Sequence, residues 1–286
     1  MSARAQRGAA VVIAMLVVAA TATLVAGVFW QQNLLARQAE NELSYAQAKW
    51  LLRGAMDWAR VILREDMRTS SVDHAGEPWA VSLAETRLNE GDGRDPVYLA
   101  GQIRDEQAKF NLRNLVGPGG VIAREMEAFR RLLALLNVNE AMAGAIAQRM
   151  LEVRLGSVDD LLALPGIDPA LVERLRPFVT VLPQATPINA NTAPAEVLAA
   201  RIDNLALADA RRLVESRDRA HFKDVADALH RLGELGLAAG EGELAVSTRF
   251  FLVEGDVSYR RARLHGRALV RRSANLVETL WLREAS

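Results

Sequence analysis

The residues of this chain best suited to proton transfer or metal binding are its four histidines, because imidazole titrates near neutral pH and is a common metal ligand. They are His74, His221, His230 and His265. They lie in different segments, and none belongs to a His-x-x-x-His or Glu-x-x-His pair suited to a metal. The chain has no cysteine, which excludes thiolate chemistry and disulfides. No nucleophile elbow, phosphate-binding loop or dinucleotide fingerprint occurs either. We therefore predict no catalytic residue and no enzymatic activity.

Carboxylates form two groups that could hold a hard cation. Such cations bind clustered carboxylate and carbonyl oxygens in loops. One group is the stretch Gly91-Asp92-Gly93-Arg94-Asp95, and the other is Asp66 with Asp73. A solvated turn is the simpler interpretation of each group taken separately. The metal ligands therefore stay unassigned.

The overall charge argues against nucleic acid as the main partner. Lysine and arginine total 35, aspartate and glutamate also total 35, and the formal net charge is zero. Proteins that hold nucleic acid are usually basic or carry a basic stripe. Half of the residues are hydrophobic, so the chain can build a sizeable core.

The N-terminal segment has the composition of a membrane span. No charged residue lies between Arg7 and Arg37, and residues 9–30 are almost wholly apolar. A helix needs about 20 such residues to cross the hydrocarbon core. Because Arg4 and Arg7 precede the span, the N-terminus is predicted to stay in the cytoplasm. A cleaved signal peptide and a plain signal anchor also fit this segment.

The residues after the span favour one long helix. Residues 31–67 contain no proline and one glycine, Gly54, and their apolar positions keep a helical spacing. At about 1.5 Å per residue, a helix over 9–67 would be on the order of 90 Å long. A signal peptide has no reason to continue as one helix into the mature protein, whereas a filament subunit uses such a helix as anchor and packing spine.

The start of the chain resembles type IV pilin-like proteins. Gln6-Arg7-Gly8, followed by Ala-Ala-Val-Val-Ile, is similar to a prepilin peptidase site. The resemblance implies cleavage between Gly8 and Ala9 and N-methylation of Ala9. Most members of that superfamily have glutamate at the fifth mature position, where this chain has Ile13. The missing glutamate is typical of the K-type minor pseudopilins of type II secretion systems, which this chain resembles.

The replacement at Ile13 has a physical interpretation. In the superfamily the glutamate is thought to neutralise the amino terminus of a neighbouring subunit within the membrane, and a buried carboxylate is costly without such a partner. A subunit with no neighbour above it in the filament meets no such terminus. The loss of glutamate therefore suits a position at the tip, although it would also suit an anchor that is not a pilin.

The remainder predicts an α+β head. Residues 97–103 and 108–112 flank Asp105-Glu106-Gln107 as in a hairpin, and the pattern Ile-x-Asp-Glu-Gln-x-x-Phe-Asn-Leu is similar to the first hairpin of K-type pseudopilins. Residues 245–257, 259–271 and 276–283 read as closing strands of an antiparallel meander, with turns near Gly255 and Arg272. The family implies that the block between them is an inserted helical, SAM-like domain. The expected organisation is a leader at 1–8, a transmembrane helix at 9–30, its periplasmic continuation at 31–68, loops and the first hairpin at 69–120, the insertion at 121–240 and the closing strands at 241–286.

The helical block also supports a rival hypothesis. Residues 157–168 and 188–198, the latter followed by 217–225, look like helix-hairpin-helix units, and DNA-uptake receptors carry a similar Ile-Asn-x-Asn-Thr-Ala string. Such hairpins present backbone N–H groups at a helix N-terminus to a phosphate. Here Asp168 replaces the second glycine of the first unit, and 201–204 replaces the Pro-Gly turn of the second. We therefore favour packing modules in which Asn191 or Thr192 caps a helix.

The resemblance implies a minor pseudopilin at the tip of the pseudopilus that takes part in its initiation and in protein export. The alternative is a membrane-anchored helix-hairpin-helix DNA-binding or uptake protein. Expected partners are the I-type and J-type minor pseudopilins, the major pseudopilin, prepilin peptidase, the membrane, and further the secretin and exported substrates, with no nucleic acid. Calcium is a cofactor that the resemblance allows. The expected location is the inner membrane, crossed once, with the head in the periplasm.

Overall fold

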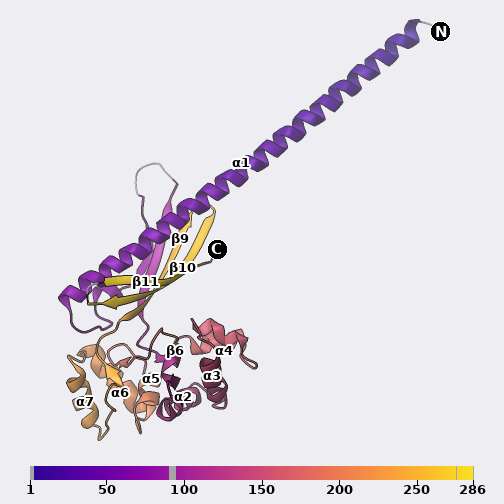
Figure 1. Ribbon diagram of the computed structural model, residues 1–286. Helices are drawn as coiled ribbons and strands as arrows, with labels where there is room; N and C mark the ends of the chain where they lie inside the picture. Colours follow the sequence, from indigo (N-terminus) through magenta and orange to yellow (C-terminus); the bar gives the residue numbers. More distant parts are fainter. Residues whose placement is uncertain (1–2, 90–94, 275, 286) are drawn as a thin grey trace.

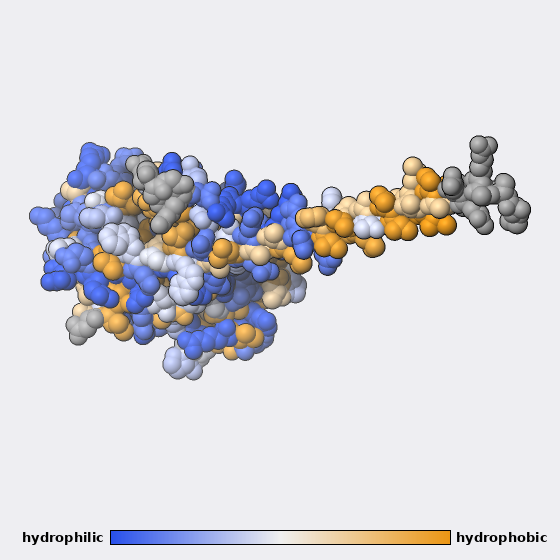
Figure 2. Space-filling model, turned by 90° about the horizontal axis from the view of Figure 1, so that it is seen from above, coloured by the Kyte–Doolittle hydropathy of each residue, from blue (hydrophilic) through white to orange (hydrophobic). Residues whose placement is uncertain are grey.

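The computed structural model describes residues 3–89, 95–274 and 276–285, with residues 3–9 described by their backbone only. A single helix, α1 (Ala3–Thr69), runs for 67 residues without a break. Its first half projects far from the rest of the molecule (Figure 1), and its surface there is almost entirely apolar (Figure 2). Among the described residues it is the one helix that is long and apolar enough to cross a membrane. The uninterrupted helix predicted over 9–67 is confirmed.

The second half of α1 packs on an antiparallel sheet, which confirms the α+β class. The sheet has the order β1-β2-β9-β10-β11, and all neighbouring strands are antiparallel. Its strands are β1 (Leu83–Arg87), β2 (Val97–Asp105), β9 (Phe250–Tyr259), β10 (Ala262–Ser273) and β11 (Leu276–Ala285). α1 lies over β9 and β10. The β1–β2 side of the same face is therefore left without a helix.

The first hairpin differs from the one predicted. β2 pairs with β1 on one side and β9 on the other, whereas Phe110 and Asn111 form β3, which pairs in parallel with β6 (Val179–Thr180). The chain therefore leaves the sheet after Asp105 instead of turning back beside β2. It returns at Phe250, whose carbonyl accepts a hydrogen bond from the backbone N–H of Glu106 at 2.9 Å. The points of departure and return thus lie side by side.

The predicted turn near Gly255 is wrong, because Gly255 lies within β9 and the chain turns at Arg260 and Arg261 instead. The turn near Arg272 is confirmed to within two residues, since β10 ends at Ser273 and Ala274 begins the turn to β11.

Gly255 stands opposite Gly101 of β2 and Gly266 of β10, which makes a row of three glycines across the sheet. Leu52 of α1 presses into this row: a Cβ atom added at Gly266 would lie 2.7 Å from Leu52 Cδ2, and one at Gly255 3.3 Å from Leu52 Cδ1. Glycine is required there because the helix approaches the sheet so closely.

Among the described residues three apolar clusters stabilise the fold, two of them large and one, made of Leu182, Phe250 and Leu269, small. The first large cluster joins α1 to the sheet through Ala48, Leu52, Met56, Ala59 and Leu63, which pack with Phe251, Val253, Leu264, Ala268 and Val270. These helix positions are three or four residues apart, as a helix with one buried face requires. The 3₁₀ helix η1 (Pro78–Ala80) closes this core with Trp79, whose ring meets that of Phe251 edge-on at 5.2 Å.

The second core belongs to the helical insertion, which hangs from the sheet at the end of α1 (Figure 1). Its helices are η2 (Leu112–Leu115), α2 (Ala123–Leu135), α3 (Met142–Glu152), η3 (Val158–Ala163), α4 (Pro169–Leu175), α5 (Ala195–Arg201), α6 (Leu207–Arg219) and α7 (Val225–Gly233). Its short strands are β3 (Phe110–Asn111), β4 (Val116–Gly117), β5 (Gly120–Val121), β6 (Val179–Thr180), β7 (Ile188–Asn189) and β8 (Leu244–Ala245). The core extends from Phe110 to Val246, beyond the expected range of 121–240, because the β3–β6 and β7–β8 pairs tie the flanking stretches to it.

Candidate functional site

An exposed apolar stripe lies on the second half of α1, where the helix packs on the sheet. Leu43, Trp50, Trp58 and Val61 are all exposed, Trp50 by 71% and Trp58 by 66%. At about 100° per residue, this stripe faces away from the buried positions of the same helix. Gly54 lies between the two tryptophans, and nothing is within 4 Å of where its Cβ would be. Large apolar side chains exposed along one face of a helix in this way mark interaction sites.

An apolar groove of about 790 Å³ runs along the flank of this stripe. Trp58 and Ile62 of α1 form one wall, Leu99 and Ile103 of β2 form the floor, and Val81 lies on the rim. The groove exists because α1 covers β9 and β10 but not β1 and β2. Every residue of β1 is exposed. The groove shares Trp50 and Trp58 with the stripe, so the apolar surface continues from the exposed face of α1 down its flank to β2.

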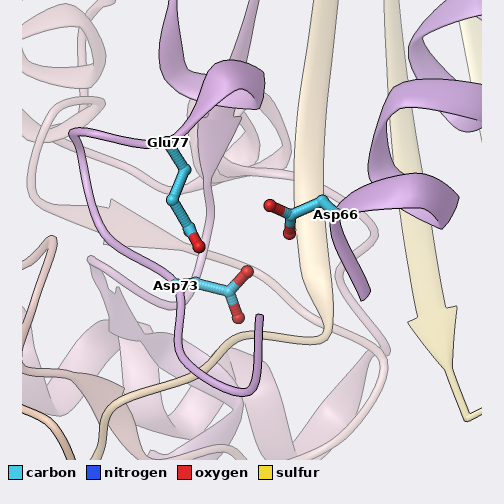
Figure 3. Close-up of side chains that lie close together, drawn as sticks. All are labelled: Asp66, Asp73 and Glu77. Atoms are coloured by element: carbon cyan, nitrogen blue, oxygen red, sulfur yellow. The ribbon is translucent and has the colours of Figure 1, made fainter. Parts of the chain in front are cut away.

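The structure brings together the predicted carboxylates Asp66 and Asp73 and adds Glu77 (Figure 3). One oxygen from each lies within 4.8 Å of the others, and all three residues are buried. Asp66 is on the last turn of α1, and Asp73 and Glu77 lie on the loop that follows. Burial raises the pKa of Asp66 to about 6, and the charge of Glu77 adds to this rise while Arg272 opposes it. Burial also raises the pKa of Asp73.

This cluster does not fit a metal ion, because a guanidinium already lies among its carboxylates, and four of their oxygens accept hydrogen bonds within the chain. Arg272 donates to Asp66 Oδ2 at 2.6 Å and to both oxygens of Asp73 at 2.5 Å. The Asp73 carboxylate also accepts from the backbone N–H of Thr248 at 2.7 Å. Glu77 Oε2 accepts from the backbone N–H of His74 and from Trp79 Nε1. Sequence reasoning missed Arg272, since nothing in a single sequence pairs it with residues about two hundred positions away.

The other predicted carboxylate group lies mostly outside the described residues. Of the stretch 91–95, only Asp95 is described, and its carboxylate forms an exposed ion pair with Arg260 at 2.5 Å. Calcium binding by this chain stays a prediction.

The first helix-hairpin-helix-like unit has its helix N-terminus occupied by its own carboxylate. Asp168 is the N-cap of α4, and its Oδ1 accepts a hydrogen bond from the backbone N–H of Leu171 at 2.7 Å. The glycine that remains, Gly166, has a φ of 82° and makes the turn. A negative side chain therefore lies where a phosphate would have to bind.

The second unit uses its polar residues inside the fold. Asn191 donates to the carbonyl of Phe222 at 3.0 Å and accepts from the N–H of Phe222 at 2.7 Å. Thr192 donates to Asp105 Oδ2 at 2.5 Å. The predicted capping role of Asn191 or Thr192 is therefore wrong: the N-cap of α5 is Pro194, which makes no side-chain bond. In the same unit Arg201, from the expected turn 201–204, is buried and pairs with Glu125 at 2.5 Å.

The motif Asp105-Glu106-Gln107 is the other half of this contact. Asp105 accepts from Asn189 Nδ2 at 2.8 Å and from the N–H of Gln107 at 2.7 Å. Glu106 accepts from Lys109 and from Thr180, each at 2.5 Å. Burial raises the pKa of Asp105 to about 6, against the hydrogen bonds from Thr192, Thr248 and Asn189. The two motifs that stood out in the sequence thus bind each other where sheet and insertion meet.

The histidines do not assemble into one site. His74 and His221 stack with their ring centroids 4.0 Å apart, across the same junction. Burial lowers the pKa of His221, and the charge of His74 adds to this effect. His230 lies 3.8 Å from Glu234, and His265 lies 2.9 Å from Asp256, both at exposed positions elsewhere. These contacts place the histidines at a junction and on the surface.

The residues expected at the processing site lie on the projecting end of α1. Gly8 and Ala9 are helical residues of α1, and Ile13, on the apolar segment that follows, is 61% exposed. Cleavage between Gly8 and Ala9 and methylation of Ala9 stay predictions.

A single apolar anchor helix that packs on an antiparallel sheet and carries a helical insertion defines a membrane-anchored, pilin-like subunit. A family model described as "Type II secretion system (T2SS), protein K" matches residues 188–247. The type II secretion system protein K of Pseudomonas aeruginosa is 31% identical over 290 residues, covering 89% of this chain and 85% of that relative. That of Klebsiella pneumoniae is 28% identical, covering 93% of each. The chain therefore belongs to the type II secretion system protein K family.

A solved structure shows the same fold. It is a chain of the GspK-GspI-GspJ complex from the type 2 secretion system of enterotoxigenic Escherichia coli, with a TM-score of 0.70 and 21% sequence identity. The match covers 87% of this chain and 99% of that one. So much of both chains is aligned that the likeness takes in the sheet and the insertion together.

Proposed function

We propose that this chain is a minor pseudopilin of the type II secretion system that lies at the tip of the pseudopilus and takes part in its initiation and in protein export. The exposed apolar stripe of α1 is the observation that carries this proposal. A helix whose inner face is already buried on its own sheet has no use for a second apolar face unless other helices pack against it. Membership of the protein K family supports the same role.

The proposed partners are the I-type and J-type minor pseudopilins and the major pseudopilin. The related chain from Escherichia coli was solved in a complex with GspI and GspJ. Their helices would lie along the stripe that contains Trp50 and Trp58. The insertion, which lies below the sheet beside the end of α1 (Figure 1), would block further addition above it and would meet the secretin or exported substrates.

The proposed maturation follows from the N-terminal residues. Prepilin peptidase would cut between Gly8 and Ala9, and Ala9 would be N-methylated. The apolar segment that begins there would hold the chain in the inner membrane, with its N-terminus in the cytoplasm and its head in the periplasm. Ile13 in place of glutamate suits a subunit with no neighbour above it. The role is structural, and we assign no catalytic residue.

The test is a double variant, Trp50→Ser with Trp58→Ser, expressed in a strain that lacks the wild-type chain. We expect normal thermal stability, because both rings are exposed, but loss of co-purification with the I-type and J-type subunits and loss of export. The matched control is Val225→Ser with Leu229→Ser, which removes two exposed apolar residues from α7 of the insertion. Export and co-purification at wild-type levels in the tryptophan variant would contradict the proposal.

Mass spectrometry of the chain purified from membranes tests the maturation separately. A start at Ala9 with an added methyl group is the expected result. An intact Met1 would mean a plain anchor, and a start near Gly27 would mean a cleaved signal peptide.

A further inference from the structure

Three parts of the molecule meet at one buried arginine. Arg272, near the end of β10, bonds to Asp66 on the last turn of α1 and to Asp73 on the loop after it. It also donates to the carbonyl of Thr248, on the stretch that returns from the insertion to the sheet, at 3.1 Å. Asp73 in turn accepts from Asn189 of the insertion through its own carbonyl, at 3.1 Å.

The guanidinium is held on all sides. Arg272 is 8% exposed, Asp66 7% and Asp73 1%. Two of its nitrogens make four hydrogen bonds to oxygen atoms, and its charge lies 4.8 Å above the ring of Phe251. A planar fork of donors is well matched to two carboxylates that approach from different elements. The arginine thus contacts oxygens of Asp66 and Asp73, two of the three carboxylates that a bound divalent cation would contact.

We propose that Arg272 is the built-in cation of this acidic junction, that it takes the place of a metal ion there, and that it fixes the orientation of the insertion relative to α1. The inference is independent of the partners proposed above, because it concerns contacts within one chain. It also departs from the calcium dependence that the pseudopilin resemblance allows, since at this junction the positive charge is covalently part of β10.

This arrangement predicts what happens when the arginine is removed. Three buried carboxylates within 4.8 Å of one another would then lose their compensating charge. Buried like charges repel, and an uncompensated buried charge is strongly destabilising. The junction would either loosen or take up a cation from solution, because carboxylate oxygens grouped in a loop are suitable calcium ligands.

The experiment uses the full chain in detergent micelles and compares Arg272→Gln with Arg271→Gln. Arg271 is the adjacent residue of the same type, but it pairs with Glu278 at an exposed position. We expect Arg272→Gln to lower the Tm by about 10 °C and calcium to restore part of that loss. We expect Arg271→Gln to leave the Tm nearly unchanged. Any difference between the Tm of wild type in calcium and in EDTA should persist in Asp73→Asn, because no calcium ion binds at this junction.

A second measurement reports orientation rather than stability. The chain has no cysteine, so Arg64→Cys on α1 and Ser216→Cys on α6 provide a unique pair of exposed positions for spin labels. Double electron–electron resonance should give one narrow distance distribution in wild type and a broad one in Arg272→Gln without calcium. Arg272→Lys, which keeps the charge and loses the fork, should give an intermediate width.

If Arg272→Gln does not fold, the double variant Asp73→Asn with Arg272→Gln removes charges of both signs and should fold with a broad distance distribution. The proposal is overturned if either arginine-free variant keeps the narrow wild-type distribution. It is also overturned if EDTA lowers the Tm of wild type and Asp73→Asn abolishes that response, because a metal ion would then occupy the junction.

Discussion

Helix α1 meets the rest of the molecule in two different ways along its length. Midway, Leu52 presses into the glycine row of the sheet, in a contact made entirely of apolar atoms and backbone. At its end, Asp66 meets Arg272 in a contact made of charges. The apolar contact stabilises the fold at any pH, and the only geometric quantity that it sets is the distance between the helix and the sheet. The charged contact has directional bonds, so it fixes an orientation, and it depends on protonation. The contrast teaches that one helix uses two kinds of contact at different places: apolar packing that adds stability alone, and directional charged bonds that add stability and also fix an orientation.

The largest expected effect is on the apolar contact. Leu52→Ala should lower the free energy of unfolding by about 2–5 kcal/mol, because it leaves a cavity over the glycine row. The loss should be the same at pH 5 and pH 8. Leu43→Ala, on the exposed face of the same helix, is the matched control and should change stability by less than about 0.5 kcal/mol. Urea denaturation of the full chain measures both. Equal losses in the two variants would mean that the two faces of α1 do not differ as described.

The next effect concerns Asp105, where the sheet meets the insertion. Unlike the loss in Leu52→Ala, its contribution to the free energy of unfolding depends on pH. The pKa of Asp105 is raised from 3.8 to about 6, so the folded state favours its protonated form. Its contribution to stability is fully present below pH 3.8 and is lost as the pH rises through about 6. Between pH 4 and pH 7 this amounts to about 2–3 kcal/mol. Asp105→Asn should remove this contribution and flatten the dependence of unfolding on pH.

The control for this prediction is a carboxylate whose pKa is shifted the other way. Arg231 lowers the pKa of Asp227, so its contribution is present at neutral pH and is lost as the pH falls. Asp227→Asn should therefore lower the free energy of unfolding at neutral pH, compared with wild type, and leave it nearly unchanged in acid. If Asp105→Asn leaves the pH dependence of wild type intact, the carboxylate is not the buried acid that the structure indicates.

The smallest expected effect comes from a pair of glycines. Gly266→Ala should cost about 1–3 kcal/mol, because the new methyl group overlaps Leu52, which is fully buried and has little room to move. Gly54→Ala should instead stabilise α1 by up to about 1 kcal/mol, since it lies on the open face of a helix. Thermal melting separates the two signs. Adding Leu52→Val to Gly266→Ala should recover part of the loss, and an additive double variant would contradict the close approach.

The parts of the fold that could be predicted are those that depend on patterns among residues close together in the sequence. The long helix follows from the absence of proline and a sustained apolar spacing, and the last strand follows from alternation within 276–283. Gly255 was misassigned because a glycine within a strand can mark either a turn or a close approach. The hairpin was misassigned because the partner of Phe110 is Val179, far along the chain. No local pattern encodes such pairings.

The candidate sites divide in the same way. The carboxylates Asp66 and Asp73 could be picked out because they lie close together in the sequence, on either side of the end of α1. Arg272 could not, because only the folded sheet brings it to them. Asn191 was expected at a helix start from its residue type, but it is satisfied by the backbone of Phe222, which only the packing of the insertion places nearby. The apolar residues on the exposed stripe of α1 are visible in the sequence. Which face of the helix stays exposed is known only once the other face is seen to pack on the sheet.

The side-by-side points at which the chain leaves and rejoins the sheet have a consequence for how such a molecule could have arisen. Because the end of β2 and the start of β9 are already paired, a short turn between Asp105 and Phe250 would close them as an ordinary hairpin. The whole insertion is therefore an elaboration of one loop, which could be gained, lost or exchanged by recombination without disturbing the strand order.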